Sequence, residues 1–267
     1  MNAVWWIPVV LGVVEGLTEF LPVSSTGHLI LVGHALRFTG DFAKTFEVAI
    51  QLGAILAVVV YFRSFLVDFA RRCLTRDATA RGFVTAVGIA FLPAATVGFL
   101  AHRAITTYLF TPQTVGVALI VGGAAILLIE AAHRRPTVTT VEAVNARTAL
   151  WVGLAQCLSL IPGVSRAGAT IMGGLLVGMD RKTATEFSFF LALPTMFAAT
   201  VYEAYKSRAL LVEESVFMLA VGSIVAFLSA LIVIDLFLTF VRRHTFRVFA
   251  YYRILVGLVV LALFWAS

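Results

Sequence analysis

The chain has few charged residues. Lys, Arg, Asp and Glu make up only 13% of its 267 residues, whereas 61% are hydrophobic. Its mean hydropathy of +1.00 is higher than soluble domains reach. The chain also lacks the alternating segments of about ten residues that form an outer-membrane barrel. The scarcity of charge therefore excludes a soluble enzyme, and repeated apolar runs of roughly 20 residues predict a helical integral membrane protein.

Other absences narrow the class further. Only two cysteines occur, Cys73 and Cys157, and their positions in a basic loop and an apolar segment predict neither a disulfide nor a metal cluster. The N-terminus lacks the basic region and cleavage site of a signal peptide, so we expect it to be retained. The net charge of +6 comes from basic residues beside predicted spans, which indicates membrane topology rather than nucleic-acid binding. With no low-complexity or soluble segment, residues 1–267 are expected to form a single membrane domain.

Ten apolar segments divide into two classes by length. Six are long enough to cross about 30 Å of hydrocarbon: residues 44–62, 83–103, 114–132, 184–205, 215–239 and 247–265. Four cover only about 16–21 Å at the rise of an α-helix: residues 3–14, 26–36, 148–161 and 166–178. Each short pair is joined by a polar motif. We therefore predict an all-α polytopic membrane protein with six full transmembrane helices and two re-entrant helical hairpins, at about 3–36 and 148–178.

The two halves of the chain share the same order of segments, with repeat 1 at about 1–132 and repeat 2 at about 148–267. Basic residues cluster at 63–81, 134–147 and 242–247, and the positive-inside rule places these clusters in the cytoplasm. Threading the spans accordingly brings the first hairpin in from outside and the second from the cytoplasm, with both chain ends outside. This arrangement is an inverted-topology repeat.

The first polar motif contains two carboxylates, Glu15 and Glu19. At a spacing of four they share one helix face, with Cβ atoms about 5–6 Å apart. A carboxylate costs at least ~2.5 kcal/mol at the bilayer centre, which favours a functional role. The pair could hold Mg²⁺ or Ca²⁺ against phosphate oxygens, or one member could be a general base. A solvated pair at the aqueous interface is the structural alternative.

The same motif continues through Pro22 into a new helix start rich in hydroxyls. Pro ends the first helix, and the free N–H groups of the next helix form a site for an anion. Ser25 is a candidate nucleophile, activated by Glu19 or His28. Candidates for substrate binding are Ser24, Thr26 and Gly27. The alternatives are that these hydroxyls only cap a broken helix and that His28 is a hydrogen-bonded core residue.

The second polar motif, at residues 161–170, supplies a cation. Arg166 is permanently charged and can hold two phosphate oxygens at once. Neighbouring candidates for substrate binding are Gly163, Ser165 and Thr170. The alternative is an ion pair between Arg166 and the Glu pair that locks the two tips together. Near the inner ends of the last two spans, Asp235 and Arg253 are expected to pair with each other or to snorkel.

These two motifs resemble the signature motifs of the bacterial undecaprenyl-pyrophosphate phosphatases, the bacitracin-resistance protein family. The resemblance covers essentially the whole chain, and it implies hydrolysis of the terminal phosphate of undecaprenyl pyrophosphate. The products would be inorganic phosphate and undecaprenyl phosphate, the carrier for peptidoglycan synthesis. By the same resemblance Glu15 and Glu19 serve metal and acid–base work, Ser25 matches the hydroxyl proposed as nucleophile, with Glu19 as its base, and His28 and Arg166 complete the catalytic set. The alternative nucleophiles are His28 and a metal-activated water. The chain departs from the family at Ala167, where Ser is common.

Two other classes of protein share some of these features. The acid-phosphatase-like lipid phosphatases share a Ser-Arg motif, but Met172 stands where their His would be. An inverted-repeat transporter, a flippase of undecaprenyl phosphate, fits the predicted architecture equally well. The density of Glu, Ser, His and Arg in two short motifs favours chemistry. We expect a bacterial inner-membrane protein whose site opens to the periplasm. The choice of Mg²⁺ or Ca²⁺, the prenyl chain length and the existence of a homodimer stay open.

Overall fold

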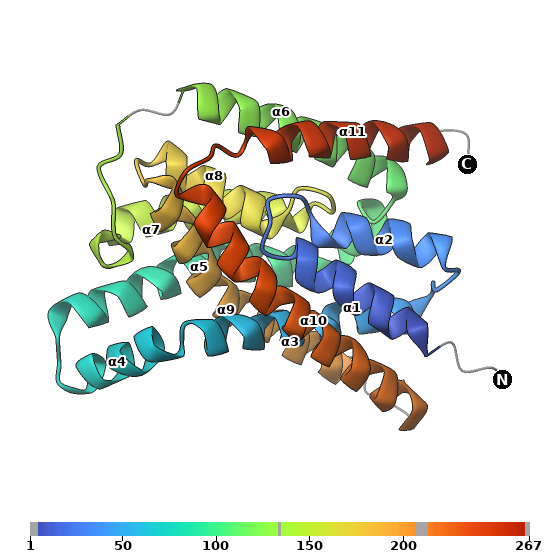
Figure 1. The fold of residues 1–267 in the computed structure, drawn as a ribbon, viewed down its shortest axis with the longest axis horizontal. Helices are drawn as coiled ribbons and strands as arrows, with labels where there is room; N and C mark the ends of the chain where they lie inside the picture. Colours follow the sequence, from blue (N-terminus) through green and yellow to red (C-terminus); the bar gives the residue numbers. More distant parts are fainter. Residues whose placement is uncertain (1–4, 133–134, 207–212, 265–267) are drawn as a thin grey trace.

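The computed structural model describes residues 5–132, 135–206 and 213–264, so parts of the predictions at residues 3, 4, 134 and 265 lie outside it. Figure 1 shows helices that pack into one bundle, with no named strand in the described ranges. The helices are α1 (Trp6–Thr18), α2 (Ser25–Ala35), α3 (Asp41–Tyr61), α4 (Arg63–Leu74), α5 (Ala78–Tyr108), α6 (Pro112–Ala132), α7 (Ala146–Cys157), α8 (Arg166–Leu176), α9 (Arg181–Lys206), α10 (Glu213–Val241) and α11 (Arg247–Phe264), with 3₁₀ turns η1 (Val141–Ala143) and η2 (Leu158–Leu160).

The prediction of six membrane-spanning helices is confirmed. α3, α5, α6, α9, α10 and α11 are each long and apolar enough to cross a membrane. α5 and α9 each contain an internal proline, Pro93 and Pro194, yet both continue as helices. The protein is therefore a multi-pass membrane protein of the all-α class.

The four short segments form two helical hairpins, α1–α2 and α7–α8. α1 and α2 have 13 and 11 residues, and α7 and α8 have 12 and 11, so none reaches the length of a span. Each pair is joined by one polar loop, residues 19–24 and 158–165, which we call the first tip and the second tip. Both tips lie inside the bundle, where Phe20, Val23 and Ser165 are buried. This geometry is consistent with the predicted re-entrant hairpins.

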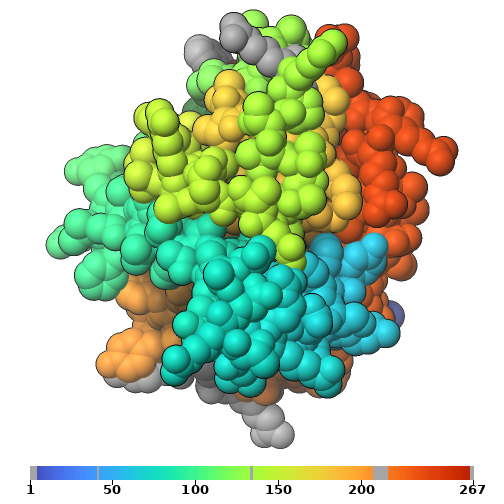
Figure 2. All heavy atoms as spheres, turned by 90° about the vertical axis from the view of Figure 1, so that its left-hand side faces the viewer, coloured from blue at the N-terminus to red at the C-terminus, as the bar shows by residue number. Residues whose placement is uncertain are grey.

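The basic segment after α3 contains the short helix α4, where the sequence suggested only a loop. α4 lies at one end of the bundle together with the segment before α7 (Figure 2). Arg72 joins these two parts, because its guanidinium binds Asp77 at 3.2 Å and Glu142 at 2.7 Å. The backbone N–H of Ala80 and then Arg72 lower the pKa of Asp77, which caps α5. At the opposite end lie the start of α1 and the end of α11 (Figure 1).

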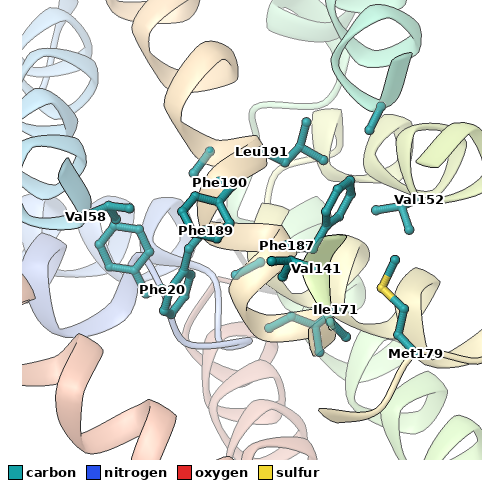
Figure 3. Close-up of a cluster of buried hydrophobic side chains, with 14 of the residues drawn as sticks. Phe20, Val58, Val141, Val152, Ile171, Met179, Phe187, Phe189, Phe190 and Leu191 are labelled. Atoms are coloured by element: carbon teal, nitrogen blue, oxygen red, sulfur yellow. The ribbon is translucent and has the colours of Figure 1, made fainter. Parts of the chain in front are cut away.

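The core beside the first tip is aromatic (Figure 3). Phe20 of the first tip packs edge-on against Phe189 of α9, with ring centroids 5.1 Å apart. Phe190 packs against Phe62, at the end of α3, at 4.9 Å. Both Phe20 and Phe189 are fully buried. The first tip is thus fixed to α9 directly beside the candidate residue Glu19.

The close packing of α1 on α10 depends on two glycines. A Cβ atom on Gly12 would lie 2.6 Å from the carbonyl oxygen of Gly222, and one on Gly16 would lie 2.5 Å from that of Ala226. Real Cβ atoms do not approach so closely. Small residues let membrane helices approach at backbone distance, where dispersion replaces the hydrophobic effect as the main attraction. Glu15 lies between these contacts on the same helix.

We predict that Gly16→Ala lowers the free energy of unfolding by about 1–3 kcal/mol, because the new methyl group overpacks the α1–α10 contact. The measurement is equilibrium unfolding in mixed detergent micelles. Gly82→Ala in α5 is the matched control, since a Cβ atom there meets nothing within 4 Å. Equal stability of the two variants would contradict this account of the packing.

Candidate active site

Both tips end in the same local structure. Ser24 precedes α2 with φ of 72°, and Ser165 precedes α8 with φ of 76°. Each serine oxygen accepts a hydrogen bond from the amide three residues later, Gly27 at 3.3 Å and Gly168 at 3.0 Å. Non-glycine residues reach this left-handed region at a cost of roughly 1–3 kcal/mol. The two tips therefore end in equivalent serine caps, each strained and each directly before a helix.

The caps set which residue begins each helix. Ser25 is the first residue of α2 and Arg166 is the first residue of α8. These two residues hold the same position in the two hairpins, at a helix N-terminus whose free N–H groups favour an anion. The candidate nucleophile Ser25 and the candidate phosphate-binding Arg166 thus occupy equivalent positions in the two hairpins.

Glu19 joins the two tips. The hydroxyl of Ser25 donates a hydrogen bond to Oε2 of Glu19, and Nη2 of Arg166 donates to Oε1 at 2.8 Å. The side chains of Arg166 and Glu19 are only 11% and 7% exposed. The ion pair considered from the sequence is therefore present, and it lies against the candidate nucleophile. One carboxylate holds a hydroxyl on one oxygen and a guanidinium on the other.

The guanidinium of Arg166 is held from several sides. Its Nη1 donates to the backbone carbonyl of Ser188 at 3.1 Å, and its charged group lies 5.9 Å from the ring centre of Phe20. Thr170, predicted to bind substrate, instead bonds the carbonyl of Arg166 at 2.9 Å and the hydroxyl of Ser188 at 2.6 Å. Thr170 therefore supports Arg166 and is only 1% exposed itself.

A cavity of about 160 Å³ lies between the two tips. Its walls combine both hairpins with α3 and α9, and most of its polar atoms are hydroxyls and the Glu19–Arg166 pair. Residues from the two motifs that line it are Glu19, Ser24, Ser25, Thr26, Ile161, Pro162, Gly163, Ser165 and Arg166. Sequence reasoning missed Ser159, Thr195 and Met196 as cavity residues, and Gln51 of α3 also lines the cavity. Thr195 and Met196 lie inside an apolar span, where no motif distinguishes them.

His28 does not join this cavity. Its Nδ1 lies 2.7 Å from the carbonyl oxygen of Ser24, and its Nε2 lies 2.6 Å from the hydroxyl of Tyr252, with the two rings stacked. A carbonyl only accepts, so Nδ1 carries the hydrogen. Both ring nitrogens are engaged, which makes His28 a brace on the cap residue. Gly27 likewise serves the cap through its amide.

Glu15 lies outside the cavity lining and is fully buried, and neither of its carboxylate oxygens has a hydrogen-bond partner. Within the described ranges no group of three or more His, Cys, Asp or Glu side chains could hold a metal alone. Mg²⁺ is commonly bound by one or two carboxylates together with substrate phosphates and water. The unpartnered Glu15 and the neighbouring Glu19 fit that oxygen-only pattern.

The expectation for Asp235 and Arg253 is wrong. Asp235 accepts a hydrogen bond from the hydroxyl of Tyr61 at 2.9 Å. Arg253 is 1% exposed, so it does not snorkel, and it binds backbone carbonyls of both tips. Sequence could not reveal this, because backbone acceptors carry no residue signature.

A model of the bacitracin resistance protein family matches residues 8–259, which include both tips and the whole cavity lining. The chain belongs to this family. Its motifs at Glu15–His28 and Pro162–Arg166 both lie within the matched range.

Several proteins named undecaprenyl-diphosphatase resemble the chain along almost its full length. The one from Nitrosomonas europaea is 55% identical, with 94% of this chain and 91% of the relative aligned. The one from Methylobacillus flagellatus is 52% identical, with 96% of each aligned. Undecaprenyl-diphosphatase 3 of Acinetobacter baylyi is 47% identical over 94% of each.

The second tip offers a sharp test of the cavity geometry. Gly163 has φ of +95°, and a Cβ atom there would lie 2.7 Å from the carbonyl oxygen of Val115. We predict that Gly163→Ala costs at least about 2 kcal/mol of stability, from backbone strain together with overpacking. It should also lower any activity of the site, because Ser165 and Arg166 follow directly.

The matched control is Gly40→Ala. Gly40 also has a positive φ, +102°, but nothing lies within 4 Å of its Cβ direction. This variant carries the strain alone, so thermal unfolding should show a smaller loss. A Gly163→Ala protein no less stable than Gly40→Ala would refute the predicted clash.

Proposed function

We propose that this protein hydrolyses the terminal phosphate of undecaprenyl pyrophosphate, giving undecaprenyl phosphate and inorganic phosphate. The observation that carries the proposal is the contact of Ser25, Glu19 and Arg166 across the two tips. This contact supports the proposal because a hydroxyl, a carboxylate and a guanidinium meet at one cavity. The substrate is inferred from the name of the relatives, undecaprenyl-diphosphatase. A bundle of membrane-spanning helices is suited to a lipid substrate. Regenerating this carrier serves peptidoglycan synthesis and accounts for resistance to bacitracin.

In the first step the hydroxyl oxygen of Ser25 attacks the terminal phosphorus, and its proton passes to Glu19. The bond between that phosphorus and the bridging oxygen breaks, and undecaprenyl phosphate leaves with the electron pair. Glu19 gives the proton from Ser25 to the departing undecaprenyl phosphate and is a carboxylate again. A water molecule then gives a proton to Glu19 and attacks the phosphorus of phosphoserine. The bond from phosphorus to the Ser25 oxygen breaks, inorganic phosphate leaves, and Glu19 returns the proton to that oxygen, which restores Ser25. Glu19 already accepts the Ser25 hydrogen bond, so the base is in place before substrate arrives.

Arg166 stabilises the charge on the phosphoryl oxygens during transfer. Glu19 lies 2.8 Å from this guanidinium and neutralises its charge. Phosphate oxygens therefore take over the guanidinium when substrate binds, which frees one carboxylate oxygen of Glu19. The N-termini of α2 and α8 add backbone N–H donors beside Thr26 and Ser165, both of which line the cavity.

A divalent cation, Mg²⁺ or Ca²⁺, is part of the proposal. Glu15 and Glu19 would hold it, and it would neutralise charge on the pyrophosphate. Glu15 supports this role because it is a buried carboxylate with two unpartnered oxygens. His28 is assigned to positioning Ser24 rather than to attack on phosphorus, since both its ring nitrogens are occupied.

The proposal places the protein in the bacterial inner membrane as an inverted-topology repeat, with the cavity opening to the periplasmic side. Thr195, Met196 and Ala199 form one wall of the cavity and lie in the half of α9 nearer Lys206. By the positive-inside rule that half faces outward, because Arg181 and Lys182 begin the helix. The polar head group would enter from the periplasm while the prenyl chain stays in lipid.

The decisive test is phosphate release from undecaprenyl pyrophosphate by purified protein in detergent. We predict metal-dependent release that chelator removes. Ser25→Ala should lower kcat by at least about 10³-fold, because it deletes the nucleophile. Arg166→Ala should cost about 10²–10³-fold through lost charge stabilisation.

The control is Thr106→Ala, which removes an exposed hydroxyl bonded only to its own helix and should leave activity unchanged. Folding of each variant is checked by gel filtration and thermal unfolding. Binding of the lipid without release of phosphate by well-folded wild type would favour the flippase instead.

The orientation is tested with an impermeant maleimide on spheroplasts. In a Cys73→Ser, Cys157→Ala background, we expect Thr26→Cys in the cavity to be labelled from outside and protected by substrate. Thr106→Cys marks the predicted outer face and Thr75→Cys the inner face. Labelling of Thr26→Cys only after membrane permeabilisation, together with Thr75→Cys, would reverse the proposed orientation.

A further inference from the structure

Arg253 of α11 is the largest fully buried side chain with a charge, at 1% exposure. It donates to five backbone carbonyls and thereby uses all five of its N–H groups. Two acceptors belong to α6, Ala118 and Leu119, at 3.2 and 3.4 Å. The other three are tip residues, Pro22 at 3.0 Å, Val164 at 2.9 Å and Gly163 at 3.0 Å. One guanidinium thus holds both tips.

The bundle is built around this guanidinium. A Cβ atom on Gly122 would lie 2.0 Å from Nη2 of Arg253, and its three nearest atoms would all belong to that side chain. A Cβ atom on Gly168 would lie 3.1 Å from Nη1. Among the ion pairs of the described residues, none includes Arg253. A buried cation without a carboxylate partner is costly, so a role must offset it.

We propose that Arg253 is a positioning residue for phosphoryl transfer, which fixes the two tips relative to each other and so sets Ser25 against Arg166. The proposal rests on the function assigned above and adds a residue to it. Arg253 touches neither the nucleophile nor the cavity lining except through the carbonyl of Gly163. Its action is therefore indirect, through the backbone of the tips.

The geometry of the peptide bond explains how this works. The bond between Val164 and Ser165 is trans, as are all the peptide bonds described. In a trans peptide the carbonyl and the N–H point in opposite directions within one plane. Because the Val164 carbonyl points at Arg253, the N–H of Ser165 points away from Arg253. On the first tip, the Pro22 carbonyl is held in the same way two residues before the strained cap Ser24. Arg253 thus fixes the peptide that precedes Ser165, and it holds the first tip two residues before Ser24.

The adjacent residue reinforces the same contact. Tyr252 binds the ring of His28, whose other nitrogen bonds the carbonyl of Ser24. Tyr252 and Arg253 are consecutive on α11, so one turn of that helix reaches the first tip at Pro22 and at Ser24. α11 therefore acts as the brace from which both tips are set.

Gly122→Ala is the sharpest test, because it displaces the guanidinium while Arg253 itself stays in the sequence. We expect a folded protein whose kcat falls about 10–100-fold, the loss that a misplacement of reacting groups by about 1 Å produces. Affinity for methylenediphosphonate, a probe that is not hydrolysed, should fall about tenfold. Arg253→Lys keeps the charge but cannot reach five carbonyls, and should show the same two losses.

Two matched controls separate positioning from general stability. Gly88→Ala adds the same methyl group to α5 where nothing lies within 4 Å. Arg181→Lys disturbs another guanidinium, which binds Glu130 away from the cavity lining. We expect Arg181→Lys to lower Tm but to keep kcat and probe affinity per folded molecule.

A double-mutant cycle of Gly122→Ala with Ser165→Ala measures whether Arg253 and Ser165 act on kcat together. Both residues hold the second tip, so the losses from Gly122→Ala and Ser165→Ala should be non-additive. The positioning role is overturned if Gly122→Ala and Arg253→Lys lower only Tm, as is expected of Arg181→Lys. It is also overturned if their losses of kcat are simply additive with the loss from Ser165→Ala. Wild type that binds the probe but releases no phosphate from the lipid would instead overturn the proposed function, and probe affinity would still test Arg253.

Discussion

The buried ion pair between Glu19 and Arg166 is the interaction on which the site depends. Either charge alone would carry a desolvation penalty of several kcal/mol in an apolar bundle. Paired at 2.8 Å, they tie together two loops that lie far apart in the chain. The pair also leaves one oxygen of Glu19 for the Ser25 hydroxyl. In the proposed mechanism, a phosphate that displaces the carboxylate from Arg166 gains a cation and leaves Glu19 as the base for Ser25 at the same moment.

That ion pair is useful only if the tips are rigid, and their backbone is strained. Non-helical backbone at membrane depth must find hydrogen-bond partners within the protein. Serine caps satisfy the amide of the third residue of α2 and of α8, and Arg253 satisfies carbonyls from both loops. The aromatic contact of Phe20 with Phe189 anchors the first tip to α9. Backbone strain, a buried cation and close packing are thus parts of one arrangement.

Features set by residues close together in the sequence could be predicted, and contacts between distant residues could not. Segment lengths were enough for six spans and two short hairpins, because hydrocarbon thickness acts on each segment separately. Spacing placed Glu15 and Glu19 on one face, yet only Glu19 lines the cavity. The partner of His28, Tyr252, lies at the other end of the chain, and no local pattern indicates it. The prediction for Arg253 was wrong because its partners are backbone oxygens, which no residue pattern indicates.

The equivalence of the two tips bears on what the site does. A symmetric binding site would gain from the same residue at the first position of α2 and of α8. The chain instead has Ser25 at one position and Arg166 at the other, one a nucleophile type and the other a pure cation. Neither hairpin alone contains both, so the site exists only where the tips meet at Glu19. Phosphoryl transfer needs both an attacking group and charge stabilisation, whereas transport needs only groups that bind. The different residues at the two equivalent positions therefore favour the phosphatase over the flippase.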